Sequence, residues 1–172
     1  MSLCKGFTQG GSNADIVLTD CKLLEARLHV ELNNTKSVPI AYLKNITNGV
    51  DWATAYKAVV SDAEDEPLVW SVEGRGGLHS WKTLNYIPTD DYDPYGVGAF
   101  SRSISRTVEY AYDDFCISEM AKGMGHTADY EKYTARSENW RNMYKADQTS
   151  YINGTNTGFT GFLQPKYLNQ TW

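Results

Sequence analysis

The chain of 172 residues has little of three things: long apolar runs, cysteine and positive charge. No run approaches the roughly 18 apolar residues that span a bilayer, and the segment 1–5 lacks the apolar core of a signal peptide. The three cysteines, Cys4, Cys21 and Cys116, have no metal-ligand spacing, and an odd number cannot all pair within one chain. We expect Cys116 to be a small core residue. The net charge of −5 argues against a nucleic-acid partner.

The composition is that of a globular domain, because 41% of the residues are hydrophobic and the length suits one core. Aromatic residues make up 13% of the chain, and their rings supply either core area or flat faces on which sugars stack. N-glycosylation sequons are more numerous than chance predicts, and they are used only in a secretory pathway. They begin at Asn33, Asn45, Asn153 and Asn169. We therefore expect a protein of the secretory pathway or the extracellular space.

The spacing of apolar residues predicts four helices, at 12–20, 51–65, 103–124 and 127–144. The second is closed by Pro67 and the third by Gly123 and Gly125. Two long connections, 67–100 and 147–172, show no periodicity and are expected to be loops. The pattern predicts an all-α fold built from inner and outer helix pairs.

The helix at 103–124 carries apolar residues on two opposite sides, which predicts a helix packed between neighbours. Arg106, Glu109 and Asp113 share one of these sides, where charges are costly to bury unless they pair or face water. Either this helix lines a polar pocket, or it is an ordinary core helix with an internal Arg106–Glu109 ion pair. With few helices available to cover it, we expect several apolar side chains to be accessible. The candidates are Phe115, Ile117 and Met120.

Several sequence blocks, in order along the chain, resemble glycoside hydrolase family 92, the calcium-dependent exo-acting α-mannosidases, and are similar to its fungal members. The blocks are Gly10-Gly-Ser-Asn-Ala-Asp-Ile-Val-Leu18, Gly49-Val-Asp-Trp-Ala-Thr-Ala-Tyr56, Glu73-Gly-Arg-Gly-Gly-Leu78, Tyr86-Ile-Pro88, Arg136-Ser-Glu-Asn-Trp140 and Gly158-Phe-Thr-Gly-Phe-Leu-Gln-Pro165. The resemblance implies that residues 1–172 are a central part of an (α/α)6 barrel, the fold of the family's catalytic domain. The rest of the barrel and a β-sandwich domain would be its missing partners.

The resemblance also implies a chemistry: inverting hydrolysis of α-mannoside glycans, α-1,2-linked mannose of N-glycans or mannan, with calcium as cofactor. In the family, the general acid and base and most calcium ligands follow the block that ends at Pro165. We therefore expect no catalytic or metal-binding residue in this chain and no activity from the chain alone. Two other functions stay open: a non-catalytic carbohydrate-binding fragment or pseudogene product, and a helical interaction scaffold.

The resemblance implies a substrate-binding role for the first block. Asp15 is matched to the carboxylate that binds the hydroxyls of the terminal mannose, and two carboxylate oxygens can accept from two adjacent hydroxyls. Gly10 and Gly11 would let the backbone approach the sugar, with Asn13 beside them. Alternatively, Asn13 or Ser12 caps a helix and Asp15 favours its N-terminal dipole.

A second set of residues either lines the pocket or packs the core. The set is Trp81, Tyr86, Glu109, Tyr110 and Asp113. His79 and His126 have no partner at a suggestive spacing and are expected on the surface.

Residues 21–40 match nothing in the family and interrupt the resemblance. Joining Asp20 directly to Ala41 would give one continuous helix with apolar residues in register. We interpret the insertion as a translated intron in a fungal gene; a genuine loop is the alternative. We expect residues 21–40 to form an irregular or poorly ordered excursion that breaks this helix into two parts, 13–20 and 41–44.

Overall fold

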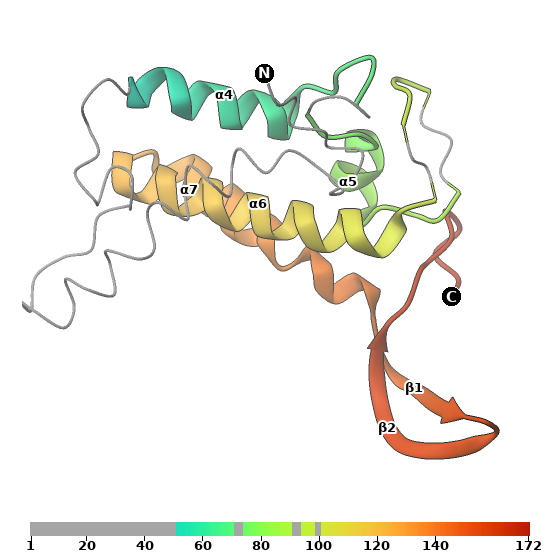
Figure 1. Ribbon diagram of the computed structural model, residues 1–172. Coiled ribbons are helices and arrows are strands. Elements are labelled where there is room, and N and C mark those ends of the chain that lie inside the picture. The colour runs from blue at the N-terminus through green and yellow to red at the C-terminus, as the bar shows by residue number, and fades with distance from the viewer. Residues whose placement is uncertain (1–50, 71–73, 91–93, 99–100) are drawn as a thin grey trace, which may run out of the picture.

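The computed structural model describes residues 51–70, 74–90, 94–98 and 101–172. The described part is a group of helices from which a β-hairpin projects (Figure 1). Its elements are α4 (Trp52–Glu64), α5 (Leu78–Leu84), α6 (Ser103–Met124), α7 (Thr127–Ser137), the 3-10 helix η1 (Asn139–Met143), β1 (Tyr144–Ile152) and β2 (Thr155–Leu163). No helix in these ranges is long and apolar enough to cross a membrane.

Helices α4 and α6 confirm the sequence prediction. Asp51 caps α4, its carboxylate accepting hydrogen bonds from the backbone N–H groups of Ala53 and Thr54. Helix α6 spans the predicted 103–124 and ends at Gly125, whose φ of 80° is the left-handed conformation of a C-terminal cap. Helix α7 begins two residues later and packs back along α6, as expected for an inner and an outer helix.

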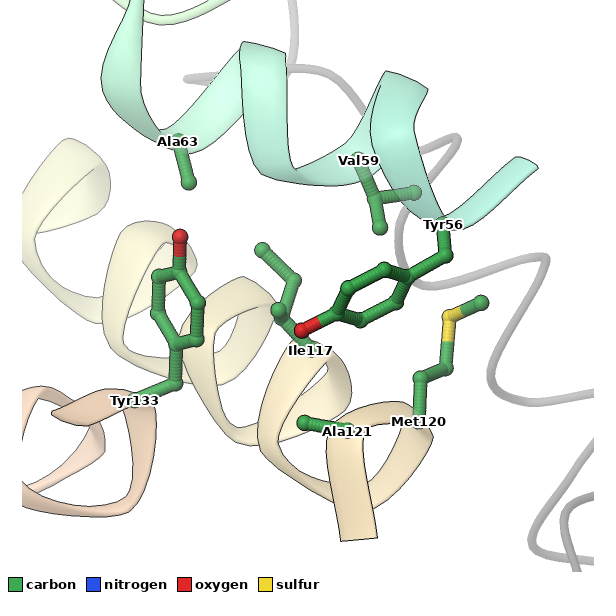
Figure 2. Close-up of a cluster of buried hydrophobic side chains, with 7 residues drawn as sticks. All are labelled: Tyr56, Val59, Ala63, Ile117, Met120, Ala121 and Tyr133. Atoms are coloured by element: carbon green, nitrogen blue, oxygen red, sulfur yellow. The ribbon is translucent and has the colours of Figure 1, made fainter. Parts of the chain in front are cut away.

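The main core lies where α4, α6 and α7 meet. Figure 2 shows its side chains pointing toward one another from the three helices. They are Tyr56, Val59 and Ala63 of α4, Ile117, Met120 and Ala121 of α6, and Tyr133 of α7. Ile117 is 0% exposed and Met120 1%, so the expectation that both are accessible is wrong. The reason is that α4 and α7 cover this side of α6 within the chain itself. Phe115 is half-buried.

The helix predicted at 127–144 ends earlier than its spacing suggested. Helix α7 stops at Ser137, η1 follows, and Tyr144 opens a strand. The backbone N–H of Glu138 donates to the carbonyls of both Ala135 and Arg136, which tightens the last turn toward 3-10 geometry. After this change of pitch, Met143 is buried and Tyr144 is exposed.

The connection 67–100 is not entirely a loop, since it contains α5. Gly77 and Asn85 flank this short helix in the left-handed conformation, with φ values of 73° and 61°. Leu78 and Trp81, three residues apart, are buried against Tyr110 of α6. Seven residues are too few for helical periodicity to be visible in the sequence.

The expectation of an all-α fold is wrong, because residues 144–163 form an antiparallel hairpin. Tyr144 pairs with Leu163 and Ile152 with Thr155, and the register shifts between Lys145 and Tyr151. Asn153 and Gly154 form the turn with φ values of 50° and 79°. An Asn-Gly pair favours this turn, because both residues tolerate positive φ. The segment predicted as a loop at 147–172 therefore contains most of a two-stranded sheet.

Candidate functional site

Two neighbouring carboxylates of α6, Asp113 and Asp114, are fully buried and lie against Arg75. The Arg75 Nη1 donates to Asp114 Oδ1 at 2.6 Å, and its Nε lies 3.7 Å from Asp113 Oδ2. Arg75 comes from the glycine-rich segment 74–77 and is itself 0% exposed. A buried guanidinium between two buried carboxylates compensates charges that would otherwise be very costly to remove from water.

Asp114 also joins two further helices. Its second oxygen, Oδ2, accepts a hydrogen bond from Trp81 Nε1 of α5 at 3.1 Å and lies 2.7 Å from Arg136 Nε of α7. Arg136 continues to Glu64, the last residue of α4, with 2.8 Å between Nη1 and Oε1. These charges form one set, here called the charge cluster: Glu64, Arg75, Asp113, Asp114 and Arg136. Among the described helices, the cluster links α4, α6 and α7 directly, and it contacts α5 through Trp81 and Lys82.

Glu64 is the partly exposed end of the charge cluster. Burial opposes its ionisation, but the hydrogen bond from Lys82 and the charge of Arg136 outweigh burial and lower the pKa of Glu64 to about 2. Lys82 Nζ lies 2.9 Å from Glu64 Oε2, and Tyr133 Oη donates to Oε1 at 2.9 Å. Burial, followed by the neighbouring Glu64 charge, raises the pKa of the Tyr133 hydroxyl. Glu64 is therefore a stable carboxylate at neutral pH.

The glycine-rich segment is fixed to α6 by Tyr110 and Arg106. Tyr110 Oη accepts from the Gly76 N–H at 3.0 Å and donates to the Gly76 carbonyl at 3.0 Å. Burial raises the pKa of Tyr110 to about 12, so the hydroxyl stays protonated. Arg106 Nη1 donates to the same carbonyl at 3.3 Å, and its guanidinium lies 4.9 Å from the centre of the Trp70 ring. Arg106 Nε donates to the Arg102 carbonyl.

The predicted pocket residues are mostly in the packed interior. Trp81, Tyr110 and Asp113 are 0% exposed and the structure brings them together, with the rings of Trp81 and Tyr110 edge to face at 5.8 Å. Tyr86 is also buried, and its hydroxyl donates to the Tyr167 carbonyl at 2.8 Å. Glu109 is half-buried, and this burial raises its carboxyl pKa. The predicted sugar-binding residues Gly10, Gly11, Asn13 and Asp15, and the insertion 21–40, lie outside the described residues.

The sequence-based prediction omitted Arg75, Asp114 and Arg136. A signal was present for Asp114, because two adjacent acidic residues on a helix with two apolar sides cannot both face solvent, and a buried one requires a cation. Nothing in the sequence identifies Arg75 and Arg136 as those cations, since they lie 39 residues before and 22 residues after Asp114. Three further expectations for single residues are confirmed: Cys116 is buried, and His79 and His126 are exposed.

An open groove of about 420 Å³ runs along α6 on a side that α4 does not cover. Its lining is mainly apolar: Val108, Ala111, Tyr112, Phe115, Ser137, Glu138 and Trp140. Helix α6 therefore has two apolar sides, as predicted. One is buried in the core, and the other lines the open groove. Within the described ranges, no group of three or more His, Cys, Asp or Glu side chains is placed to hold a metal ion.

The family model described as "Glycosyl hydrolase family 92 catalytic domain" matches residues 1–172. A curated relative from Arthroderma benhamiae, named "Uncharacterized secreted glycosidase", is 55% identical over 172 residues. The match covers all of this chain and 20% of that protein, so the chain spans about one fifth of the relative's length.

Two solved structures of a family GH92 alpha-mannosidase from Bacteroides thetaiotaomicron are similar in fold. One has a TM-score of 0.52, and the other, a complex with mannoimidazole, has 0.53. Both are 24% identical to this chain, and each match covers 87% of this chain and 16% of the other.

Proposed function

The chain belongs to glycoside hydrolase family 92, and from this membership we propose that it is part of the catalytic domain of an exo-acting α-mannosidase. The observation that carries the proposal is the family match over all 172 residues, supported by 55% identity to a glycosidase. The similar fold of a mannosidase whose structure was solved in complex with mannoimidazole supports a mannoside as the ligand. The name of the curated relative supports a secreted protein.

In this proposal the chain contributes substrate binding and helix packing rather than the reacting carboxylates. Asp15 would accept hydrogen bonds from two hydroxyls of the terminal mannose. The charge cluster holds α4, α5, α6 and α7 in fixed positions, which a sugar site built on these helices requires. An inverting reaction needs one carboxylic acid and one carboxylate on opposite sides of the glycosidic bond, and we assign neither to this chain.

We further propose that the intact catalytic domain is an (α/α)6 barrel, that it is specific for α-1,2-linked mannose in N-glycans or mannan, and that calcium is its cofactor. Helix α6 packed against α4 and α7 is consistent with an inner barrel helix. Calcium, when bound, would hold vicinal hydroxyls of the sugar. We assign no calcium ligand to this chain, because the resemblance places most of the calcium ligands after the block that ends at Pro165.

The function is tested by inserting this chain in place of the matching segment of the Arthroderma benhamiae relative. The chimera and the isolated chain are each assayed for mannose release from α-1,2-mannobiose, with calcium and with a chelator. We expect release by the chimera and none by the isolated chain. In the chimera, Asp15→Asn should lower kcat/KM by about 10- to 100-fold. This is the loss in rate that corresponds to the free energy of one hydrogen bond to a charged group.

The matched control is Glu131→Gln, which changes an exposed carboxylate of α7 and should leave kcat/KM unaltered. A folded chimera that releases no mannose from any α-mannoside contradicts the proposed function. Release by the isolated chain contradicts the assignment of the reacting carboxylates to other parts of the protein. Mannose binding without turnover by the chimera would instead support a carbohydrate-binding protein.

A further inference from the structure

Two of the four sequons lie in the described part of the chain, and their asparagines are both exposed. Asn153 is at the tip of the β-hairpin and Asn169 is in a turn after β2. N-glycosylation requires more than the motif, because the asparagine carboxamide must be accessible and correctly oriented. The two sequons differ in that orientation.

At Asn169 the side chain is held by the threonine of its own sequon. Asn169 Oδ1 accepts a hydrogen bond from the Thr171 N–H at 3.1 Å and another from the Thr171 hydroxyl at 2.7 Å. A backbone N–H can only donate, so the accepting atom must be the oxygen, which settles the orientation of the carboxamide. The amide nitrogen Nδ2 then lies on the opposite side of the planar group from these two donors.

The turn that carries Asn169 is formed by local hydrogen bonds. The Gln170 N–H donates to the Tyr167 carbonyl and the Tyr167 N–H donates to the Thr171 carbonyl, both at 2.9 Å. Gln170 has a φ of 68°, which places Asn169 and Thr171 on the same side of the turn. Because all of these contacts lie within residues 167–171, the turn can form in a nascent chain before distant segments pack.

The folded protein keeps this turn at its surface. The Thr89 N–H donates to the Lys166 carbonyl at 2.8 Å, and Tyr86 Oη donates to the Tyr167 carbonyl. The residues from Tyr167 to Trp172 are themselves exposed. A glycan on Asn169 would therefore project into solvent without disturbing the buried residues that anchor the turn.

The sequon at Asn153 has a different geometry. Asn153 has a φ of 50° in the hairpin turn, and Thr155 is the first residue of β2, where it pairs with Ile152. Within the hairpin as described, no hydrogen bond joins the Asn153 side chain to Thr155, in contrast to the pair at 169 and 171.

We propose that Asn169 is an N-glycan attachment site, preorganised by Thr171, and that it is modified more completely than Asn153. Asn169 Nδ2 forms a bond to C1 of the first sugar of a lipid-diphosphate-linked oligosaccharide. The bond from C1 to the diphosphate oxygen breaks, the lipid diphosphate leaves with the electron pair, and Nδ2 loses one proton. The proposal rests on the secretory location proposed above but not on mannosidase activity.

The test uses the full 172-residue chain fused to a cleavable signal peptide and translated with microsomes. Glycan occupancy is measured at each sequon by mass spectrometry, after peptide-N-glycosidase in heavy-oxygen water has converted modified asparagine to labelled aspartate. We expect Asn169 to be labelled in most chains whose signal peptide has been removed, and Asn153 in fewer. Because glycans are added during entry, the measurement does not depend on the chain folding alone.

Variants separate the hydroxyl from the rest of the sequon. Thr171→Ala should abolish modification of Asn169, whereas Thr171→Ser, which keeps the hydroxyl, should retain it. Thr155→Ala is the matched change in the other sequon and should leave Asn169 modified. Absence of label at Asn169 in chains with a removed signal peptide overturns the proposal, and so does higher occupancy at Asn153. Neither result bears on the mannosidase assay, so failure of this proposal is distinguishable from failure of the proposed function.

Discussion

Asp114 is the residue at which the glycine-rich segment, α5, α6 and α7 meet. One carboxylate accepts from Arg75 and Trp81 and pairs with Arg136, all within 3.1 Å. Because Asp114 is 0% exposed, water cannot replace a lost partner. Such a residue stabilises the fold mainly by preventing uncompensated charges elsewhere.

Asp114→Asn should therefore be strongly destabilising. The amide removes the negative charge and presents an NH2 group to side chains that only donate, which leaves Arg136 and Arg75 poorly compensated. We expect the free energy of unfolding to fall by about 3–5 kcal/mol, measured by urea denaturation. Glu131→Gln on the exposed face of α7 should change it by less than about 0.5 kcal/mol. Equal effects of the two substitutions would contradict the role given to Asp114.

Glu64 should make stability depend on pH in the acid range. Its pKa is lowered from the ordinary 4.5 to about 2 in the folded chain, so the unfolded chain binds the proton more readily. The stabilisation is present above pH 4.5 and is lost as the pH falls from 4.5 toward 2. The urea midpoint of the wild-type chain should decrease as the pH is lowered through this range. Glu64→Gln should have a lower midpoint at pH 7 and a smaller decrease between pH 4.5 and pH 2. Parallel pH curves for the two proteins would refute the assignment.

The glycine-rich segment 74–77 packs so closely against Trp70 that a side chain added at one of its glycines would overlap the indole ring. A Cβ added at Gly76 would overlap the indole of Trp70, and a Cβ at Gly98 would do the same. Trp70 is 4% exposed and its ring also lies beneath the Arg106 guanidinium, so it has little freedom to move. Gly76 and Gly98 are needed for this close approach, whereas Gly74 and Gly77 have φ values of 67° and 73°, which favour glycine for conformational reasons.

Gly76→Ala should destabilise the chain by about 1–3 kcal/mol, the usual cost of overpacking, with a change in tryptophan fluorescence. Gly125→Ala is the comparison, because its Cβ would contact nothing within 4 Å and only its positive φ opposes the change. Pairing Gly76→Ala with Trp70→Leu should recover part of the loss in a double-mutant cycle. Strict additivity of the two substitutions would show that the indole does not cause the strain.

At the scale of the described chain, the β-hairpin stands apart from the helices (Figure 1). Several of its apolar side chains are exposed. Tyr151, Ile152 and Phe159 are 60%, 66% and 70% exposed. A two-stranded sheet has two open edges, and a hairpin alone is marginally stable in water. The α6 groove adds a second apolar area. Both features agree with a chain that spans one fifth of its relative's length.

The isolated chain should self-associate through the hairpin. Replacing Ile152 and Phe159 together by threonine removes exposed apolar area while keeping β-branched residues in the strands. We expect less light scattering at equal concentration and an unchanged urea midpoint. Ile117→Thr is the control, because this side chain is fully buried and its change should lower the midpoint without reducing scattering. A monomeric wild-type chain at high concentration would contradict the prediction.

The sequence by itself determined the features that depend on neighbours along the chain. The bounds of α4 and α6 follow from apolar spacing, Asp51 and the glycine after α6, and the ordered motif blocks identified the family. The turn of the hairpin is also encoded locally, in Asn153-Gly154, but the same asparagine begins a sequon, so the pair has two interpretations. A local signal that serves two purposes is not resolved by the sequence alone.

Only the tertiary structure decided which residues meet across the chain. Asp113 and Asp114 predict a need for buried cations, but Arg75 and Arg136 become those cations because α6 brings the glycine-rich segment and α7 to the same point. Ile117 and Met120 are buried for the same reason, since α4 and α7 pack on one side of α6. Spacing along a helix shows that a side must be covered. The element that covers it depends on packing energies that no single segment contains.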